Sequence, residues 1–359
     1  MLKKAGALFL VGGSIAMWVG CGTTSSRFLY AAIPASSEIV AYREDPNSGV
    51  LTPLAVNPIL AGQAVQSLVI HPKKNFLYAA NSGATPQGNV SLYTISDTGT
   101  LTEVTPRTTT GSVPTILTMD STGSFLFVGN SGSEDISVFS IDAKTGVLTQ
   151  VGANFPIGLV PMNLQLSPSG NFLYVTGEGS TGLIEVFPVN QGTIGRPVTG
   201  SPFQTGNDPF GLAINSAGTF LYTANKADNT ISEFTINADG SLTQLQNSPL
   251  GQSYVAPVSL LIDKTGKYLY VANQGSTDLS AYNIASDGGL NVLASSPFAA
   301  PANPSFIASD SSGKFLFVGS QGSSAAIESF ALDPNSGTLT KVQSYSVSGG
   351  TATSIAITP

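Results

Sequence analysis

The sequence predicts an all-β fold, a seven-bladed β-propeller whose blades are four-stranded and antiparallel. A six-residue phrase of the type Phe-Leu-Tyr-Val-Ala-Asn occurs seven times, at intervals of 47 to 49 residues. Between successive phrases, short apolar runs alternate with turn-forming residues, as expected for several strands in each repeat. The last residues of the chain match the part that the first repeat lacks. A period of this length, held over most of the chain, is typical of a repeat architecture.

The phrase predicts the second strand of each blade, because large apolar residues alternate in it and Asn or Gly ends it. It reads FLYAAI at 28–33, FLYAAN at 76–81, FLFVGN at 125–130, FLYVTG at 172–177, FLYTAN at 220–225, YLYVAN at 268–273 and FLFVGS at 315–320. We interpret its aromatic residues as packing between blades rather than as ligand platforms.

The other strands are clearest in the fourth repeat. Residues 161–167 predict a first strand, 172–176 the second and 183–189 the third, before a turn and a weaker fourth strand. In other repeats the turn between the third and fourth strands carries Asp or Asn followed by Gly, as at 142–149, 237–243 and 333–340. Gly accepts a positive φ, so this pattern predicts a hairpin.

The two ends of the chain are predicted to form one blade together. No first strand precedes Phe28, whereas the chain ends in SIAITP, with Ile355 and Ile357 at the places of Leu164 and Leu166. The C-terminal strand therefore completes the first blade and closes the ring, which removes an exposed sheet edge.

The innermost strands carry one large aliphatic residue per blade and small or polar residues beside it. The aliphatic set is Leu68, Leu117, Leu164, Leu212, Leu260, Ile307 and Ile355. Blades converge on the axis, so small neighbours are needed there. We find no charged residue among these inner positions.

Composition excludes several classes of partner. The chain of 359 residues has a net charge of −7, and its 14 Lys and Arg residues form no basic stripe. We therefore expect no nucleic-acid partner and no attraction of the folded body to an anionic membrane.

The first residues predict export. Lys3 and Lys4 precede an apolar run at 5–19, which suits a signal peptide over 1–20. The following Val-Gly-Cys-Gly resembles the lipobox of bacterial lipoproteins and implies a lipid anchor on Cys21, with 21–26 as a tether and 27–359 as the propeller. The expected location is the bacterial cell envelope, on the periplasmic or surface side. An ordinary cleaved signal is the alternative. Cys21 is the single cysteine, so no internal disulfide can form.

Metal and cofactor chemistry is not expected. His71 is the one histidine, and it stands five residues before its phrase, where other repeats have Asp120, Ser167, Asn215, Asp263 and Asp310. We interpret it as the polar residue that opens a turn, which leaves no base for a Ser-His-acid triad. With one His and one Cys, zinc and copper sites are not predicted. Glu38, Asp135 and Asp278 precede the third strands and are interpreted as turn caps.

Candidate functional residues lie on one rim. Strands alternate in direction, so the turns after the first and third strands share a tight-turn face, and the longer loops share a loop-rich face. Long loops on a rigid scaffold commonly carry function. Glu178, Asp208 and Lys226 are the catalytic candidates there, two carboxylates to activate water and a cation to polarise a carbonyl. The ligand-binding candidates are Glu134, Asn163, Asn225 and Asp228. Scattered, solvated loop charges are the alternative.

The repeats resemble the lactonase-type seven-bladed propellers, the family of 6-phosphogluconolactonase and carboxymuconate cyclase. The likeness covers roughly 27–359 and is carried by the unit Asp/Ser-x-x-Gly-x-Phe-Leu-Tyr-Val-Ala-Asn. It implies metal-independent opening of a sugar lactone by water. Where active members have Pro-His, Asp-Arg, Pro-Arg-His and Asn-Glu, this chain has Pro114-Thr115, Glu134-Asp135, Pro209-Phe210-Gly211 and Asn225-Lys226. The basic groups that would hold a phosphate are thus missing or replaced by acids.

Two functions follow as expectations. In the first, the protein is a lipid-anchored envelope propeller with little or no catalysis, which binds a small molecule, a glycan or an envelope protein at the loop-rich face. In the second, it is a hydrolase that opens a sugar lactone with its rim carboxylates and without a cofactor.

Overall fold

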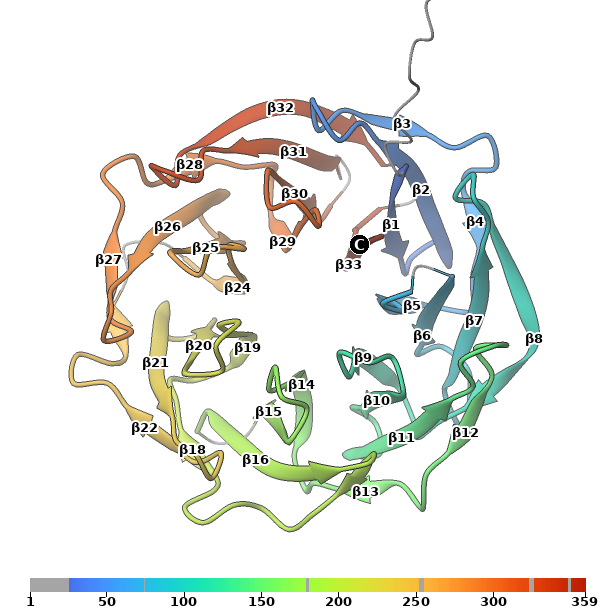
Figure 1. Ribbon diagram of the computed structural model, residues 1–359, viewed down its shortest axis with the longest axis horizontal. Helices are drawn as coiled ribbons and strands as arrows, with labels where there is room; N and C mark the ends of the chain where they lie inside the picture. The colour runs from blue at the N-terminus through green and yellow to red at the C-terminus, as the bar shows by residue number, and fades with distance from the viewer. Residues whose placement is uncertain (1–25, 74, 179–180, 252–254, 323–325, 348–349) are drawn as a thin grey trace, which may run out of the picture.

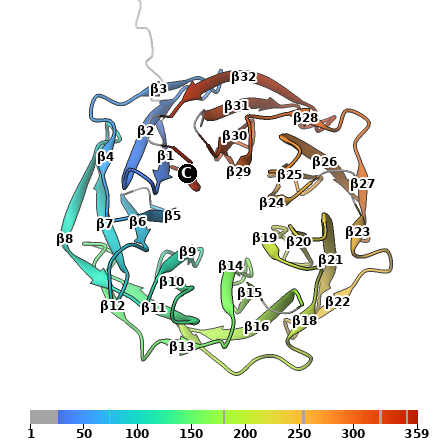
Figure 2. The same ribbon diagram turned by 180° about the vertical axis from the view of Figure 1, so that it is seen from behind.

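Seven small β-sheets surround a central axis in the computed structural model (Figure 1). The structure describes residues 26–73, 75–178, 181–251, 255–322, 326–347 and 350–359, and within these ranges its regular elements are all strands. The view from behind shows the same ring, with the sheets standing radially like blades (Figure 2). The predicted seven-bladed propeller is confirmed.

Each blade has four strands, A to D, from the axis outwards. The A strands are β5 (Val65–Ile70), β9 (Pro114–Met119), β14 (Val160–Leu166), β19 (Pro209–Ile214), β24 (Pro257–Ile262), β29 (Pro304–Ser309) and β33 (Ser354–Ile357). The B strands, which contain the repeated phrase, are β1 (Arg27–Ile33), β6 (Phe76–Asn81), β10 (Phe125–Asn130), β15 (Phe172–Glu178), β20 (Phe220–Asn225), β25 (Tyr268–Asn273) and β30 (Phe315–Ser320).

The outer strands complete the blades. The C strands are β2 (Glu38–Glu44), β7 (Asn89–Ile95), β11 (Asp135–Ile141), β16 (Leu183–Asn190), β21 (Thr230–Ile236), β26 (Asp278–Ile284) and β31 (Ala326–Leu332). The D strands are β3 (Leu51–Pro53), β8 (Leu101–Thr109), β12 (Leu148–Gln150), β17 (Thr193–Ile194), β22 (Leu242–Gln244), β27 (Leu290–Val292) and β32 (Leu339–Ser346). Five short strands continue the outer edge and also pair with a C strand: β4 (Ile59–Leu60), β13 (Phe155–Pro156), β18 (Phe203–Gln204), β23 (Leu250–Gly251) and β28 (Phe298–Ala299).

The C-terminal strand closes the ring as predicted. β33 pairs antiparallel with β1, with Ile357 opposite Leu29 and Ile355 opposite Ala31. Ile355 is 4 % exposed, so the closing strand is part of the core. Blade I is therefore assembled from both ends of the chain.

The phrase also joins each blade to the next. The ring of Phe28 lies against Gly99, in the C–D turn of blade II, where an added Cβ would come within 2.3 Å of it. Gly99 has φ +82°, a conformation that glycine adopts without steric cost. The Tyr30 hydroxyl then donates to the Gly99 carbonyl at 2.7 Å. Phe315 of blade VII packs on Gly49 of blade I in the same way, so the predicted aromatic packing between blades is confirmed.

Polar side chains organise the A–B turns. The Asp310 carboxylate accepts the backbone N–H of Phe315 at 2.9 Å, and Asp120 does the same for Phe125 at 2.6 Å. At the corresponding place the buried His71 accepts the N–H of Lys73 on Nδ1 at 3.1 Å, so its Nε2 donates to the Gly123 carbonyl at 3.1 Å. Burial lowers the pKa of His71. Its role is structural, as expected from its register.

Candidate functional site

A β-bulge re-aims one residue near the start of each A strand in blades II to VII. In β9, Pro114 pairs with Asn130 and Ile116 with Gly129, so Thr115 has no partner in the ladder. Bulges of this kind redirect a side chain and are common beside active sites. The corresponding extra residues form a set that we call the bulge residues: Gln66, Thr115, Met162, Phe210, Val258 and Ser305.

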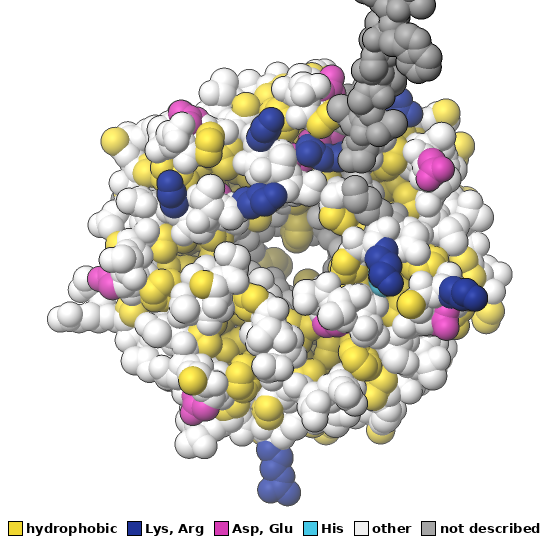
Figure 3. Space-filling model, viewed as in Figure 1, with side chains coloured by type: hydrophobic (Ala, Val, Ile, Leu, Met, Phe, Trp, Pro, Cys, Tyr) yellow, Lys and Arg dark blue, Asp and Glu magenta, His cyan; other side chains and the backbone are white. Residues whose placement is uncertain are grey.

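The bulge residues line an axial cavity of about 560 Å³. All seven A strands contribute to its wall, and Thr353, just before β33, occupies the place of the bulge residue in blade I. Ser131 and Gln321, which follow B strands, also line it. The cavity therefore lies towards the loop-rich face. In the space-filling view, the visible surface of the central opening is yellow, for hydrophobic side chains, and white (Figure 3).

The chemistry of the cavity is that of hydroxyls and side-chain amides. Its described lining residues include no ionisable side chain. Two of its buried polar atoms, Thr115 Oγ1 and Gln165 Oε1, have no hydrogen-bond partner among the residues that the structure describes. By contrast, the Thr353 hydroxyl donates to the Gln66 carbonyl at 2.8 Å, and the Ser305 hydroxyl to the Ala352 carbonyl at 2.6 Å. Buried polar atoms are normally paired, so these two oxygens on blades III and IV are exceptions among the residues of the cavity wall.

Three of the predicted residues meet where blades IV and V adjoin. Asn163 lines the cavity and donates through Nδ2 to the Phe210 carbonyl at 3.3 Å. Lys226 Nζ lies 5.1 Å from the centroid of the Phe210 ring, a cation–π contact at the edge of the cavity wall. The Asp208 carbonyl accepts the Lys226 N–H at 2.8 Å, and Asp208 has φ +54° before Pro209. Asp208 and Lys226 thus adjoin Phe210 without lining the cavity themselves.

Glu178 ends β15 opposite Val160, a cavity-lining residue. Its backbone therefore lies at the same rim of blade IV. The side chain of Glu178 is outside the described part of the structure.

The remaining candidates hold loops in place and are absent from the cavity wall. Asn225 is fully buried, and its Nδ2 donates to Thr230 at 2.9 Å and to Ser232 at 2.8 Å. The Asp228 carboxylate accepts both the backbone and the side-chain N–H of Asn207, at 2.7 and 3.0 Å. The Glu134 carbonyl accepts the N–H of Ile157 at 3.1 Å from a turn with φ +52°. Among the four predicted binding residues, Asn163 is thus the one that lines the cavity.

The bulge residues were missed by sequence reasoning, although a signal exists. Pro begins most A strands and is followed by a residue whose type changes from blade to blade, as in Pro114-Thr115, Pro209-Phe210 and Pro304-Ser305. Thr115 and Phe210 also occupy the places where the resemblance led us to expect His and Arg. Two positions that carry basic groups in the family motifs are therefore cavity-lining positions here, with neutral side chains, whereas Asp135, at the place of a third, is not part of the cavity wall.

In the part of the chain that the structure describes, no three His, Cys, Asp or Glu residues lie close enough together to hold a metal ion. Within the same residues no helix has the length and apolar character to cross a membrane. The predicted signal peptide and Cys21 lie outside the described residues.

Comparison with known families gives one match over most of the chain. The family described as "Lactonase, 7-bladed beta-propeller" matches residues 23–160 and 155–303. Curated relatives include the 6-phosphogluconolactonases of Cronobacter sakazakii, 38 % identical over 115 residues, and of Erwinia tasmaniensis, 36 % identical over 115 residues. Each match spans about a third of both proteins: 32 % of this chain, and 32 % and 33 % of the relatives.

Solved structures share the fold along nearly the whole chain. The periplasmic gluconolactonase PpgL of Pseudomonas aeruginosa superposes with a TM-score of 0.79, covering 93 % of this chain and 99 % of its own, at 20 % identity. A protein from Lactobacillus plantarum gives a TM-score of 0.78 over 92 % of this chain and 99 % of its own, at 19 % identity. At such identities the likeness is one of fold.

Proposed function

Because this chain belongs to the lactonase family of seven-bladed β-propellers, we propose that it hydrolyses a small lactone that carries no phosphate group. The observation that carries the proposal is the axial cavity, whose described lining combines hydroxyls, amides and apolar groups with no ionisable side chain. The curated relatives act on a phosphorylated lactone by their names, whereas the described lining of this cavity holds no cationic side chain.

A phosphate group needs positive charge or several strong donors to replace its hydration. In the cavity wall, the bulge positions of blades III and V hold Thr115 and Phe210, neither of which supplies charge. Lys226 is not part of that wall, and its Nζ lies against the Phe210 ring, 5.1 Å from the centroid. An uncharged, hydroxyl-bearing ring suits such a wall, because the hydroxyl and amide side chains that line it can donate and accept hydrogen bonds without supplying charge.

The proposed reaction is addition of water to the lactone carbonyl. Water loses a proton as its oxygen bonds to the carbonyl carbon; the ring C–O bond then breaks, and the released alkoxide takes up a proton to give a hydroxy acid. Glu178 and Asp208, at the rims of blades IV and V, are the proposed bases. The Lys226 ammonium is the proposed counter-charge for the oxyanion. General acid–base help of this kind is worth about 10²–10⁴-fold.

A second candidate function is binding of the same neutral ligand without hydrolysis. The absence of an ionisable group from the described cavity lining favours it, because an acid or base must reach the reacting atoms directly or through one water. The two candidates share a ligand and differ in whether the rim carboxylates reach it.

Proton release from glucono-δ-lactone and from 6-phosphogluconolactone, measured at constant pH against the spontaneous rate, tests both candidates. We expect acceleration with the neutral lactone and none with the phosphorylated one. Glu178→Gln or Asp208→Asn is expected to abolish the acceleration, whereas His71→Ala, in a distal turn, leaves the rate per folded molecule unchanged. Saturable binding of the neutral lactone without acceleration would establish the binding function instead. Acceleration with the phosphorylated lactone alone would refute the proposed substrate class.

We propose further that the protein is a lipoprotein whose tight-turn face is turned towards the membrane. Arg27 begins β1 and contacts Asp310, which belongs to the A–B turn of blade VII. The chain before residue 27 therefore joins the propeller on the tight-turn side. Residues 22–26 can extend by about 17 Å, so an acylated Cys21 would leave the loop-rich face and its cavity exposed to the surroundings.

A further inference from the structure

A second cavity, of about 390 Å³, lies at the periphery between blades V and VI. Its wall combines Glu233 of β21, the stretch Leu245–Asn247 beyond β22, and the C–D turn of blade VI from Ala285 to Leu290. It shares no lining residue with the axial cavity, and the proposed lactonase function makes no use of it.

Glu233 is an exception within the repeat. On β21 it lies opposite Tyr222, the third residue of the phrase, and it is 3 % exposed. In the other six blades the residue at this place is small or apolar: Ala41, Leu92, Val138, Val186, Ala281 and Ser329. A buried carboxyl at an otherwise apolar position is costly unless it is paired, and departures of this kind concentrate at functional sites.

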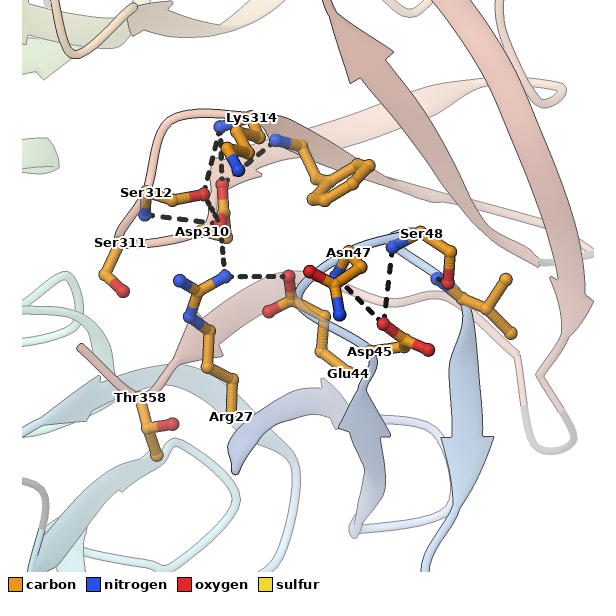
Figure 4. Close-up of polar contacts among 12 residues, drawn as sticks. Arg27, Glu44, Asp45, Asn47, Ser48, Asp310, Ser311, Ser312, Lys314 and Thr358 are labelled. Atoms are coloured by element: carbon orange, nitrogen blue, oxygen red, sulfur yellow. Dashed lines mark hydrogen bonds and ion pairs between the residues drawn. The ribbon is translucent and has the colours of Figure 1, made fainter. Parts of the chain in front are cut away.

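Each of the other four buried carboxyl groups in the described residues has either a cationic side chain or several backbone N–H groups beside it. Arg27 lies between Glu44 and Asp310, as Figure 4 shows, at 3.4 and 2.6 Å. Lys341 binds Glu328 at 2.6 Å. The fourth, Asp263, accepts two backbone N–H groups in its turn, from Lys267 at 2.8 Å and Tyr268 at 2.7 Å.

Glu233 has fewer partners than these carboxyl groups. Its Oε1 accepts the backbone N–H of Leu290 at 3.1 Å, and among the described residues no Lys or Arg forms an ion pair with it. The cavity beside it carries a second carboxylate, Asp287, and no Lys or Arg among its described lining residues. Tyr222 is the other titratable neighbour, and its hydroxyl donates to the Gly288 carbonyl at 2.7 Å. Burial, and then Asp287, raise the pKa of Glu233 to about 7. The site therefore lacks one positive charge.

We propose that this cavity binds the ammonium group of a small organic molecule, with Glu233 and Asp287 as its counter-charges. The side-chain amides of Gln246, Asn247 and Asn291, which also line the cavity, supply hydrogen bonds to the rest of the ligand. The volume suits an organic cation, because cavities of about 300–1,000 Å³ are typical for small molecules. A bare metal ion would leave most of this space empty and would find only two carboxylates.

Proton linkage makes the proposal specific. An ammonium ion pairs with the ionised form of Glu233, so binding must displace the proton that the buried carboxyl holds below about pH 7. The affinity is therefore expected to fall as the pH drops from 8 to 5.5. A neutral molecule of the same shape would show no such dependence on this carboxyl.

The probe is n-butylammonium chloride, with n-butanol as its neutral counterpart, and the readout is the NMR shift of the Leu290 amide, which donates to Glu233. At pH 8 we expect a saturable shift with butylammonium, a dissociation constant raised at least tenfold in Glu233→Gln and at pH 5.5, and a smaller loss in Asp287→Asn. The matched control is Glu185→Gln, which removes another partly buried carboxyl with a raised pKa outside both cavities and is expected to bind as the wild type.

Four results would overturn the proposal. They are no saturable shift with butylammonium at pH 8, equal binding by Glu233→Gln, equal binding of butanol, and a saturable shift with calcium chloride alone. Thermal melts of each variant show whether it is folded; Glu233→Gln removes a buried charge and keeps the side-chain shape, so it is expected to fold.

Discussion

The guanidinium of Arg27 lies 2.6 Å from the carboxylate of Asp310, across the seam where blade VII meets blade I. The two residues are 283 positions apart in the sequence. The same nitrogen lies 3.4 Å from Glu44 at the end of β2. Because Asp310 and Glu44 are 2 % and 1 % exposed, one cation contacts two buried carboxyl groups at the point where the ring closes.

Removing that cation is predicted to destabilise the propeller strongly. Arg27→Ala leaves two buried carboxylates without a counter-charge, and loss of one partner from a buried pair costs about 3–5 kcal/mol. Urea unfolding measures the change. Arg107→Ala is the control, because Arg107 binds Glu103 at the surface, with 35 % of its side chain exposed, and such pairs contribute about 0–1 kcal/mol. Equal effects of the two substitutions would contradict the role assigned to the seam.

Stability is predicted to fall between about pH 5 and pH 7 through two acids. Burial raises the pKa of Glu44 and of Glu233 from 4.5 to about 7. In that window the folded state holds more protons than the unfolded state, so the free energy of unfolding decreases as the pH rises. The decrease ends above about pH 7, where both states are ionised.

The diagnostic quantity is the difference between wild type and Glu233→Gln in urea unfolding at pH 5, 6, 7 and 8. Burial lowers the pKa of His71, so His71 makes the free energy of unfolding increase with pH. This contribution is the same in both proteins. We expect the free energy of unfolding of Glu233→Gln, minus that of the wild type, to increase as the pH rises. A difference that is constant with pH would contradict the raised pKa of Glu233.

The closing strand is predicted to be indispensable. Ile355 is 4 % exposed and packs with Leu29, Ala31 and Phe317 in one core cluster. Ile355→Ala is therefore expected to cost about 2–5 kcal/mol, and Ile357→Ala less, because Ile357 is only partly buried. A chain that ends at residue 349 loses β33 altogether. Cooperative melting of that shortened chain at the temperature of the full one would refute closure by this strand.

The fold was predictable because its main contacts recur with the repeat. The first aromatic residue of each phrase meets a C–D turn glycine of the next blade, as Phe28 meets Gly99, and a contact made seven times leaves a periodic signal. The Arg27–Asp310 pair occurs once. Sequence reasoning assigned Asp310 to a turn, but nothing local indicated that a residue 283 positions away would reach it.

The site was harder to predict because it depends on register. A bulge decides that Thr115, rather than Ile116, lacks a ladder partner, and a pattern of apolar residues does not reveal where a ladder slips by one. The rim carboxylates were predicted as site residues because they are charged and lie in loops. Thr115 and Phe210 are uncharged and gave no such signal. Glu233 was not predicted as a site residue because it lies within a strand, and the residues at its position in the seven repeats were not compared with one another.

Lipidation is predicted to anchor the protein through Cys21. Cys21→Ala removes the thiol that would carry the acyl chain, so the protein is expected to move from the membrane fraction to the soluble fraction. Cell fractionation with mass determination of the N-terminal peptide measures this. Cys21→Ser is a second variant that keeps the size of the side chain and is expected to behave as Cys21→Ala. Wild-type protein found soluble and unacylated would refute the anchor.

Two threonines that line the axial cavity, Thr115 and Thr353, are predicted to contribute differently to ligand binding and to stability. Thr115 Oγ1 has no partner within the described protein, whereas the Thr353 hydroxyl donates to the Gln66 carbonyl at 2.8 Å. Loss of an unmade hydrogen bond costs the fold nothing, and loss of a made one costs about 0.5–1.5 kcal/mol. Thr115→Val is therefore expected to keep or raise the melting temperature and to weaken binding of glucono-δ-lactone several-fold. Thr353→Val is expected to lower the melting temperature. If Thr115→Val leaves lactone binding unchanged, the free oxygens at blades III and IV do not form the ligand site.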